Sequence, residues 1–279
     1  MILPAFLPAL PAIAIETVES LPDQLEGAIA VGPYSQARPG AWLRVVPGLA
    51  RFLVTDGARL QVAIEDGADL DHVMALIHGP ATAALIYQRG EFPLHAATLV
   101  APGGDRAVAI MGQKGAGKST QAYALIDSGW RLLNDDLSRI SIVEGRVLVW
   151  PGRPGIRLCK DACDRYGLDT GTMARAGGEG EKYVAPVQPL AGPVALHAMV
   201  EIDRGGGRAI EKLASLSAIA TVSGHTFRPN YIRALDVAQG QLSLVARIIG
   251  SCAVWHLPVG GSPQDFAAGI ETALFGLQE

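Results

Sequence analysis

Residues 112–119 have the composition and spacing of a loop that binds phosphate. They read Gly-Gln-Lys-Gly-Ala-Gly-Lys-Ser, and the glycines allow the backbone to curl so that several N–H groups point at one phosphate. We expect Lys118 to contact the terminal phosphates of ATP and Ser119 to ligate the accompanying Mg²⁺. The residues predicted to bind the nucleotide in this loop are Gly112, Gln113, Lys114, Gly115, Ala116, Gly117, Lys118, Ser119 and Thr120.

Two adjacent carboxylates follow this loop at a short interval. Asp135 and Asp136 lie 16 and 17 residues after Ser119, at the end of the next apolar run. A carboxylate there can ligate magnesium or accept the proton of an attacking hydroxyl, and a charged neighbour is expected to raise the pKa of one of the pair. Successive side chains of a strand point to opposite faces, so we expect one of the two to meet the phosphate. The alternative is that Asn134-Asp135-Asp136 serves only as a turn.

Other candidate residues stand outside the loop. His95 precedes an apolar run that we expect to pair with the strand entering the loop, where it is either a near-neutral titrating group or a packing residue. Lys182 lies in a glycine-rich stretch and either closes over the transferred phosphoryl group or is a solvated charge. Arginines that can clamp a carboxylate or a phosphate, or are ordinary surface residues, are Arg153, Arg157, Arg228 and Arg233. Histidines without ligand spacing, interpreted as structural, are His72, His78, His197, His225 and His256.

The composition favours a compact protein and disfavours nucleic acid as a partner. Of 279 residues, 49% are hydrophobic and 18% charged, and the net charge of -4 provides no overall basic field. Three cysteines without paired spacing indicate reduced thiols in a cytoplasmic protein. Residues 1–15 are apolar but contain no Lys or Arg and three prolines, which favours an extended segment over a secretion signal. No apolar run reaches the roughly 20 residues that span a membrane.

Residues 1–90 are predicted to form a small β-rich domain ending in a linking helix. Short apolar runs separated by Pro-Gly and Asp-Gly pairs indicate an antiparallel sheet. The apolar N-terminal segment is expected to pack on a neighbouring strand or on another subunit, which leaves a homo-oligomer open. Apolar residues at helical spacing predict a helix over 69–89, capped by Asp69 or Asp71 and stopped by Gly90. The strands expected in this sheet are 41–46, 50–54 and 60–64.

Residues 91–279 are predicted to form the catalytic domain, in which the phosphate-binding loop joins a strand to a helix. The expected order is strand, turn, strand, loop, helix and strand, followed by a hairpin that turns at Glu144-Gly145. A glycine-rich segment over 151–193 is predicted to be a long loop. The expected strands are 94–100, 107–111, 130–133, 137–143, 146–150, 194–202, 209–213 and 252–257, and the expected helices are 118–128, 215–223, 230–249 and 263–277.

Taken together, residues 92–142 resemble the catalytic domain of the bacterial HPr kinase/phosphorylase family. That family has a strand histidine, a Gly-x-x-Gly-x-Gly-Lys-Ser loop and a Gly-x-Arg-Leu-x-x-Asp-Asp segment in the same order. The resemblance implies a mixed α/β fold (α+β) with a P-loop, HPr-kinase-like C-terminal domain. It also implies a serine kinase in which Asp136 is the general base, His95 and Asp135 support it, and Lys118 and Ser119 hold phosphate and metal.

Two features separate this chain from that family. The family uses a downstream glutamate for magnesium, whereas the comparable region here, residues 151–157, reads Pro-Gly-Arg-Pro-Gly-Ile-Arg. Residues 46–54 and 90–96, together with the Pro-Gly-Arg-Pro run, resemble the shorter HPr-kinase-like proteins of lasso-peptide biosynthesis. This second resemblance implies a precursor peptide phosphorylated on its C-terminal serine. HPr or another small protein is the alternative acceptor, and a nucleotide-binding switch without transfer is the alternative class.

Overall fold

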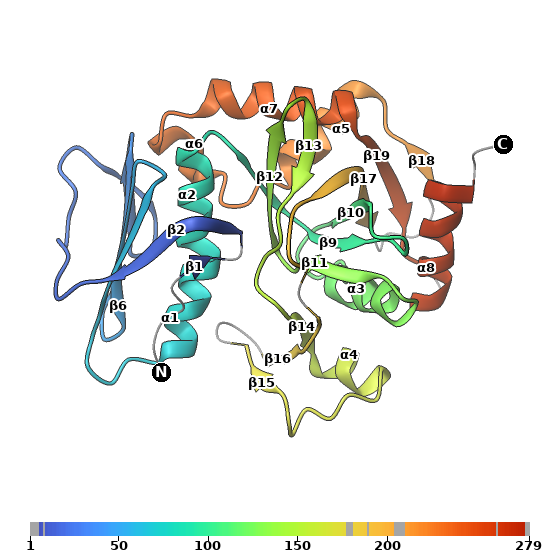
Figure 1. Cartoon of the computed structure of the whole chain (residues 1–279), viewed down its shortest axis with the longest axis horizontal. Coiled ribbons are helices and arrows are strands. Elements are labelled where there is room, and N and C mark those ends of the chain that lie inside the picture. Colours follow the sequence, from blue (N-terminus) through green and yellow to red (C-terminus); the bar gives the residue numbers. More distant parts are fainter. Residues whose placement is uncertain are drawn as a thin grey trace.

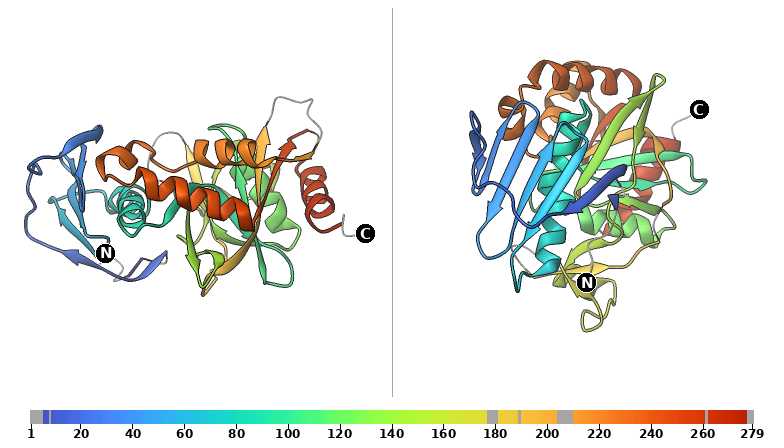
Figure 2. Two further views of the ribbon diagram at one scale, coloured as in Figure 1. Left: turned by 90° about the horizontal axis from the view of Figure 1, so that it is seen from above. Right: turned by 60° about the vertical axis from the view of Figure 1, so that its left-hand side comes forward.

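The computed structural model describes residues 6–7, 9–176, 181–188, 190–203, 210–260 and 262–276. Within these ranges the chain forms a mixed α/β structure whose sheets have seven, nine and three strands. The seven-stranded and nine-stranded sheets lie on opposite sides of helices α1 (Leu70–Leu76) and α2 (Thr82–Gln88), as Figures 1 and 2 show.

The N-terminal sheet has the strand order β1-β2-β7-β6-β5-β4-β3. The three strands predicted from the apolar runs are present as antiparallel neighbours, and the N-terminal segment is extended as expected. However, β2 pairs with β7 in parallel, so the expectation of a purely antiparallel sheet is wrong. The strands are β1 (Phe6–Leu7), β2 (Leu10–Thr17), β3 (Ile29–Gly32), β4 (Ser35–Arg38), β5 (Ala41–Val46), β6 (Ala50–Thr55) and β7 (Arg59–Ile64).

The helix predicted over 69–89 is interrupted by a wider turn. Helix α1 begins after Asp69, whose side chain accepts two backbone N–H groups, and α2 is followed by Gly90 with φ of 69°. These two boundaries confirm the predicted cap and stop. Between the helices, Ile77–Ala81 is a π-helical turn that contains Pro80. Proline has no N–H to donate, which explains why the regular helical ladder gives way here.

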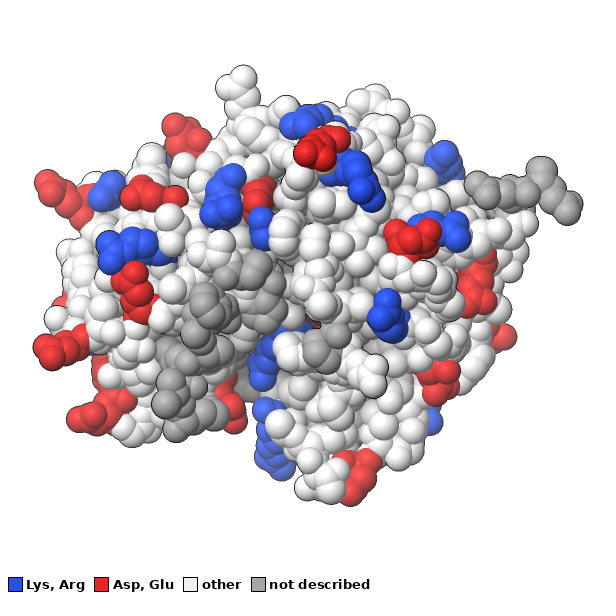
Figure 3. All heavy atoms as spheres, in the orientation of Figure 1, with Lys and Arg blue, Asp and Glu red and all other residues white. Residues whose placement is uncertain are grey.

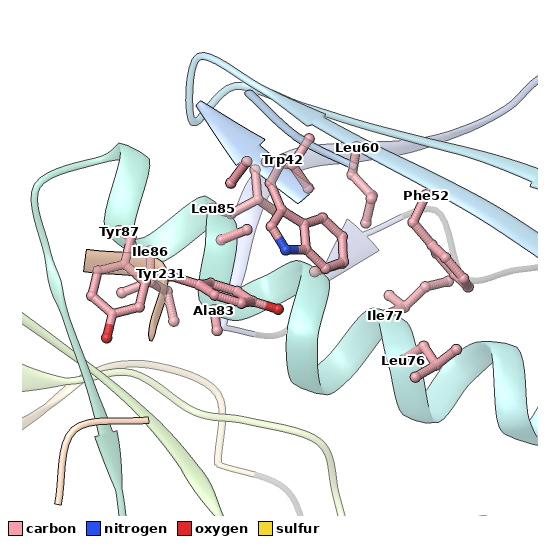
Figure 4. Packing of buried hydrophobic residues seen from close by; sticks show 14 of the residues in the cluster. Trp42, Phe52, Leu60, Leu76, Ile77, Ala83, Leu85, Ile86, Tyr87 and Tyr231 are labelled. Carbon is pink, nitrogen blue, oxygen red and sulfur yellow. The ribbon is translucent and has the colours of Figure 1, made fainter. Parts of the chain in front are cut away.

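The core between the N-terminal sheet and this helical segment includes a residue from far along the chain. Trp42 and Phe52 from the sheet are fully buried against the helices (Figure 4). Tyr231 of α6 (Asn230–Ala234) joins them, with its ring centroid 5.8 Å from Trp42 and 6.1 Å from Tyr87. Burying each such aromatic side chain contributes about 1.5–3 kcal/mol. The N-terminal core is thus completed by the C-terminal part of the chain, and the domain boundary at residues 90/91 stays a prediction.

The nine-stranded sheet places the phosphate-binding loop at the end of its interior strand β10. Strand β10 pairs antiparallel with β9 and parallel with β17, and β17 pairs parallel with β19. The strands are β8 (Phe92–His95), β9 (Ala97–Val100), β10 (Arg106–Met111), β11 (Arg131–Asn134), β12 (Leu137–Val143), β13 (Arg146–Val149), β17 (Val194–Asp203), β18 (Glu211–Lys212) and β19 (Ala253–Pro258). The predicted strand start at Ala209 lies outside the described residues.

The strand predicted over 94–100 is two strands that break at Ala96. His95 ends β8, and its partner is Leu137 on β12 rather than a residue of β10. The expectation that His95 begins a strand paired with β10 is therefore wrong, although β9 does pair with β10. At the break, the Ser138 hydroxyl of β12 donates to the Ala96 carbonyl and also contacts the Thr98 hydroxyl.

Helices cover both faces of this sheet. Helices α3 (Lys118–Asp127) and α8 (Pro263–Glu271) cover one face, and α5 (Ser215–Gly224) and α7 (Ala238–Ser251) cover the other. The single helix predicted over 230–249 is wrong, because Asp236 has a φ of 56° and separates α6 from α7. Helix α8 ends in a π-helical turn, Thr272–Gly276, and Leu277 lies outside the described residues.

The segment predicted to be a long loop, 151–193, contains a three-stranded sheet and a helix. Its strands are β14 (Ile156–Cys159), β15 (Ala174–Arg175) and β16 (Lys182–Ala185), and its helix is α4 (Lys160–Arg165). Alternate residues of β14 and β16 are buried in the same core as α3, namely Ile156, Leu158, Tyr183 and Ala185. Because these alternate side chains are buried, the segment packs against the core next to the phosphate-binding loop. Gly177, Gly178 and Gly180 lie outside the described residues.

The surface carries both acidic and basic side chains, as the nearly balanced charge of the sequence leads us to expect. Acidic and basic side chains are interspersed over the face seen in Figure 3. The three cysteines are free thiols, as expected. Among the described residues, no helix is both long enough and apolar enough to cross a membrane.

Candidate phosphoryl-transfer site

The loop between β10 and α3 has the curled backbone that its sequence predicts. Gly115 and Gly117 have φ angles of 87° and 97°, in the region that favours glycine. Gly112 is needed for a different reason, because a Cβ there would lie 2.9 Å from the carbonyl oxygen of Ile202. The loop therefore passes directly over the end of β17, and its last glycine precedes the N-terminus of α3, which favours anions.

Lys118 lies at the start of α3 and turns back toward the loop. Its Nζ donates to the Gly112 carbonyl at 2.6 Å. Burial lowers the pKa of Lys118, while the negative charges of Asp136 and Asp135 oppose that shift. This ammonium lines the cavity of the loop and is a cation available to a terminal phosphate.

Asp135 links the loop to β14 by hydrogen bonds to both. Its Oδ1 accepts from the Ser119 hydroxyl at 3.1 Å, and its Oδ2 accepts from the backbone N–H of Arg157 at 2.9 Å. The Arg157 Nε lies 3.3 Å from the same Oδ2. Ser119 and Asp135 thus present two hard oxygen donors side by side, which fits the preference of Mg²⁺ for oxygen ligands completed by substrate phosphates.

Asp136 lies between a histidine and an arginine. Its Oδ1 is 3.0 Å from His95 Nε2, and its Oδ2 is 2.8 Å from Arg157 Nη2. Burial opposes ionisation, but the hydrogen bond from His95 and the charge of Arg157 outweigh it and hold the pKa of Asp136 well below its usual range. The expectation that the paired carboxylates raise a pKa is therefore wrong for Asp136. This side chain is an anion at neutral pH.

The phosphate-binding loop and Asp136 open onto one cavity of about 500 Å³. Its size is within the range of small-molecule sites in proteins. Lys182 of β16 reaches the same cavity because β16 pairs with β14, with Lys182 opposite Cys159. The cavity is lined by His95, Gln113, Lys114, Gly115, Gly117, Lys118, Ser119, Thr120, Asp136, Arg157, Leu158, Cys159 and Lys182.

His95 is held in place by a segment that the sequence patterns did not single out. Its backbone N–H donates to the carbonyl of His225 at 2.8 Å, and its ring packs edge-on against Phe227 at 5.6 Å. The His225 ring is itself buried and lies 2.8 Å from Glu201 Oε1 on β17. These contacts are consistent with the structural interpretation of His225, and its backbone carbonyl binds the backbone of His95. His95 is far from His225 and Phe227 in the sequence, so no local sequence pattern could have predicted these contacts.

Of the four candidate arginines, one lies in the cavity of the phosphate-binding loop and the other three lie elsewhere. Arg157 is part of the site, and Arg153 lines a second, smaller cavity. Arg228 lies over the ring of Phe227 at 5.7 Å, and Arg233 is in the last turn of α6. Neither Arg228 nor Arg233 lines the cavity of the phosphate-binding loop.

Gly152 allows the chain to cross closely over the residue that precedes the aspartates. Asn134 is buried and donates to the Trp150 carbonyl at 2.7 Å, while the Gly152 N–H donates to Leu133 at 2.9 Å. A Cβ on Gly152 would overlap Asn134 Oδ1. We expect Gly152→Ala to lower the free energy of unfolding by about 1–3 kcal/mol. Denaturant unfolding checks this prediction.

The matched control for Gly152→Ala is Gly240→Ala. Gly240 lies in α7, and a Cβ there would meet no atom within 4 Å. Because Ala favours a helix over Gly by about 1 kcal/mol, this control is expected to be neutral or stabilising. Equal losses in both variants would contradict the close crossing as the cause.

The low pKa of Asp136 also predicts how stability changes in acid. A carboxyl whose pKa is lowered by folding stabilises the protein above its unfolded pKa of about 3.9, and this contribution disappears as the pH falls through the folded pKa. We therefore expect the wild type to lose more stability than Asp136→Asn between about pH 5 and pH 2. Denaturant midpoints measured across this range provide the test, and parallel curves for the two proteins would contradict it.

Comparisons with known proteins give only distant similarity to solved structures. No protein-family model matches the chain, and neither does any curated protein. Among solved structures, the chain is similar to the Hpr(Ser) kinase/phosphatase from Coxiella burnetii, with 14% identity and a TM-score of 0.38 over 67% of this chain and 99% of that chain. The chemistry of the site is therefore inferred from the residues of this chain and not from a relative.

Proposed function

We propose that this protein is an ATP-dependent phosphotransferase that phosphorylates a serine hydroxyl. The observation that carries the proposal is the position of Asp136. This carboxylate is held by His95 and Arg157 on the wall of the same cavity that contains Lys118 and Ser119. A phosphate-binding loop alone supports nucleotide binding, whereas an oriented anion beside the phosphates supports transfer to a hydroxyl.

In this proposal the loop positions ATP for reaction. Its backbone N–H groups and the N-terminus of α3 bind the phosphates, and Lys118 neutralises their negative charge. Ser119 and Asp135 are the residues that would hold Mg²⁺, which supplies further neutralisation of the phosphate oxygens when bound. Lys182 lines the same cavity and adds a further cation to it.

Asp136 accepts the proton of the serine hydroxyl. The serine oxygen forms a bond to the γ-phosphorus, the bond from that phosphorus to the β–γ bridging oxygen breaks, and ADP leaves with the electron pair. A strongly ionised carboxylate is a weak base, which suits a loose transition state in which the hydroxyl proton transfers late. Arg157 and His95 hold Asp136 in position during this step.

For the acceptor, we propose a ribosomal precursor peptide phosphorylated on its C-terminal serine. The resemblance of residues 46–54, 90–96 and 151–154 to kinases of lasso-peptide biosynthesis supports this choice. HPr is the alternative carried by the resemblance of residues 92–142. The test is incubation with ATP, Mg²⁺ and each acceptor, followed by intact mass measurement. A phosphate gained by the peptide and not by HPr is the expected result, and the reverse would overturn the peptide assignment.

A further inference from the structure

Arg157 has hydrogen-bond donors that its ion pairs with the two aspartates do not use. Its backbone N–H and its Nε lie 2.9 and 3.3 Å from Asp135 Oδ2, and its Nη2 lies 2.8 Å from Asp136 Oδ2. A guanidinium group carries five N–H donors in one rigid plane. Among the described residues, Nη1 of Arg157 has no hydrogen-bond partner. The aspartates therefore hold the guanidinium in place while its Nη1 donors stay available.

The side chain of Arg157 is open to the cavity of the phosphate-binding loop. It lines that cavity and is 32% exposed, although it bonds to both aspartates. Its neighbours in β14, Ile156 and Leu158, are buried in the core that also contains residues of α3. Because successive side chains of a strand point to opposite faces, the burial of these neighbours leaves Arg157 on the face that is open to the cavity.

Positive charge exceeds negative charge in the lining of this cavity. Its described lining contains one carboxylate, Asp136, and four cationic side chains: Lys114, Lys118, Lys182 and Arg157. An excess of this sign suits a ligand with several negative charges, such as a nucleoside triphosphate. Arg157 is in addition in direct contact with Asp136, the residue that we propose as the base.

The contact with Asp136 places Arg157 close to the group that is transferred. A general base must come within about 2.6–3.2 Å of the hydroxyl whose proton it takes. In the transition state the oxygen of that hydroxyl approaches the phosphorus, whose three equatorial oxygens carry much of the negative charge. A guanidinium nitrogen 2.8 Å from Asp136 is therefore next to these oxygens.

The ion pair also makes the effect of Arg157 depend on the progress of the reaction. Before transfer, the negative charge of Asp136 offsets part of the positive charge of Arg157. When Asp136 takes the hydroxyl proton it becomes neutral, so the attraction of Arg157 for the phosphoryl oxygens increases. Interactions that strengthen in the transition state accelerate the chemical step, whereas interactions of constant strength only improve binding.

We propose that Arg157 is a catalytic residue whose Nη1 donates to a non-bridging oxygen of the transferred phosphoryl group, while Nε and Nη2 remain on the aspartates. This inference rests on the proposed kinase function and adds a transition-state contact to it. No covalent bond forms or breaks at Arg157, which neutralises charge while the serine oxygen attacks and ADP leaves. A lysine cannot replace it, because a single ammonium lacks the planar fork that reaches all three partners.

The experiment compares a mimic of the transition state with a mimic of bound ATP. ADP with aluminium fluoride and Mg²⁺ provides the first, and a non-hydrolysable ATP analogue with Mg²⁺ provides the second. We expect Arg157→Met to bind the ATP analogue within about 3-fold of wild type and to bind the aluminium fluoride complex about 10²- to 10³-fold more weakly. Equilibrium titration of both complexes measures these affinities.

A second variant and a control keep this test independent of folding. Arg157→Lys retains a cation beside the aspartates and is expected to fold even if Arg157→Met does not. It is also expected to lose at least about 10-fold in affinity for the aluminium fluoride complex alone. Arg165→Met is the matched control, because Arg165 is exposed in the last turn of α4 and does not line the cavity. It is expected to bind both complexes as wild type does.

A double variant separates direct contact with the phosphoryl group from support of Asp136. If Arg157 acts only by holding Asp136, Arg157→Met has no further effect in the Asp136→Asn background. We expect instead a further loss of at least about 10-fold in affinity for the aluminium fluoride complex. The absence of a further loss overturns the inference, and so does an equal loss for both complexes in Arg157→Lys.

These outcomes differ from a failure of the kinase proposal. Wild type that binds the two complexes equally and transfers no phosphate to peptide, HPr or water contradicts the kinase proposal, and the role of Arg157 falls with it. Wild type that transfers phosphate, together with Arg157→Lys that transfers it at the same rate, overturns the role of Arg157 alone.

Discussion

Asp136→Asn is expected to reduce the rate of phosphoryl transfer by about 10²- to 10⁴-fold, the range that general base catalysis contributes in enzymes. The amide has the same shape as the carboxylate but cannot accept the hydroxyl proton. Lys118, Ser119 and the loop are unchanged, so the affinity for ATP is expected to stay close to that of wild type. Single-turnover transfer from labelled ATP and equilibrium nucleotide binding, measured on the same preparation, test both parts.

The control for this variant is Asp66→Asn, because Asp66 is an exposed aspartate in a turn of the N-terminal sheet. It is expected to transfer phosphate as wild type does. Normal transfer by Asp136→Asn would remove Asp136 from the reaction and favour a protein that binds nucleotide without transferring phosphate. Loss of ATP binding in Asp136→Asn would show that the His95–Asp136–Arg157 contacts shape the loop rather than the chemistry.

Lys118→Met is expected to weaken ATP binding and to lower transfer by about 10²- to 10³-fold, the effect of removing one charge-stabilising group from an active site. Methionine preserves much of the length and apolar stem of lysine, so the start of α3 should keep its packing. What is lost is the ammonium, which lies 2.6 Å from the Gly112 carbonyl and shares a cavity with Asp136. Nucleotide titration and initial rates at saturating acceptor measure the two losses.

Lys212→Met is the matched control because Lys212 is exposed on β18 and does not line the cavity of the loop. Its affinity for ATP and its rate are expected to be those of wild type. If Lys118→Met bound ATP normally, the loop would not be the nucleotide site. Together the two variants separate nucleotide binding from the chemical step. Lys118→Met is expected to weaken both ATP binding and transfer, whereas Asp136→Asn is expected to slow transfer alone.

Much of the site was predictable because its signals are local. The phosphate-binding loop, the strand before it and the helix after it depend on residues that are neighbours in sequence, and glycine at 115 and 117 meets a requirement of the backbone itself. The hairpin that turns at Glu144-Gly145 and the cap at Asp69 are local in the same sense. The bonding of Asp135 to Ser119 also follows the predicted interval.

The parts that the sequence alone left open depend on contacts between distant segments. Arg157 was one of four candidate arginines, and only the pairing of β14 with β16 beside the loop brings it to both aspartates. His95 was assigned to the wrong strand partner, because β8 ends at His95 and pairs with the distant strand β12. A raised pKa was expected for one of the two aspartates, whereas the pKa of Asp136 is lowered, since its neighbours His95 and Arg157 come from elsewhere in the chain.

The sequence by itself therefore determined the loop and the two carboxylates that follow it, because glycine conformation and strand and helix periodicity act over a few residues. The tertiary structure decided what surrounds those carboxylates: His95 and Arg157 on Asp136, and the second cavity with Arg153. Long-range sheet pairing and the packing of the N-terminal segment bring these groups together, and neither leaves a periodic pattern in the sequence.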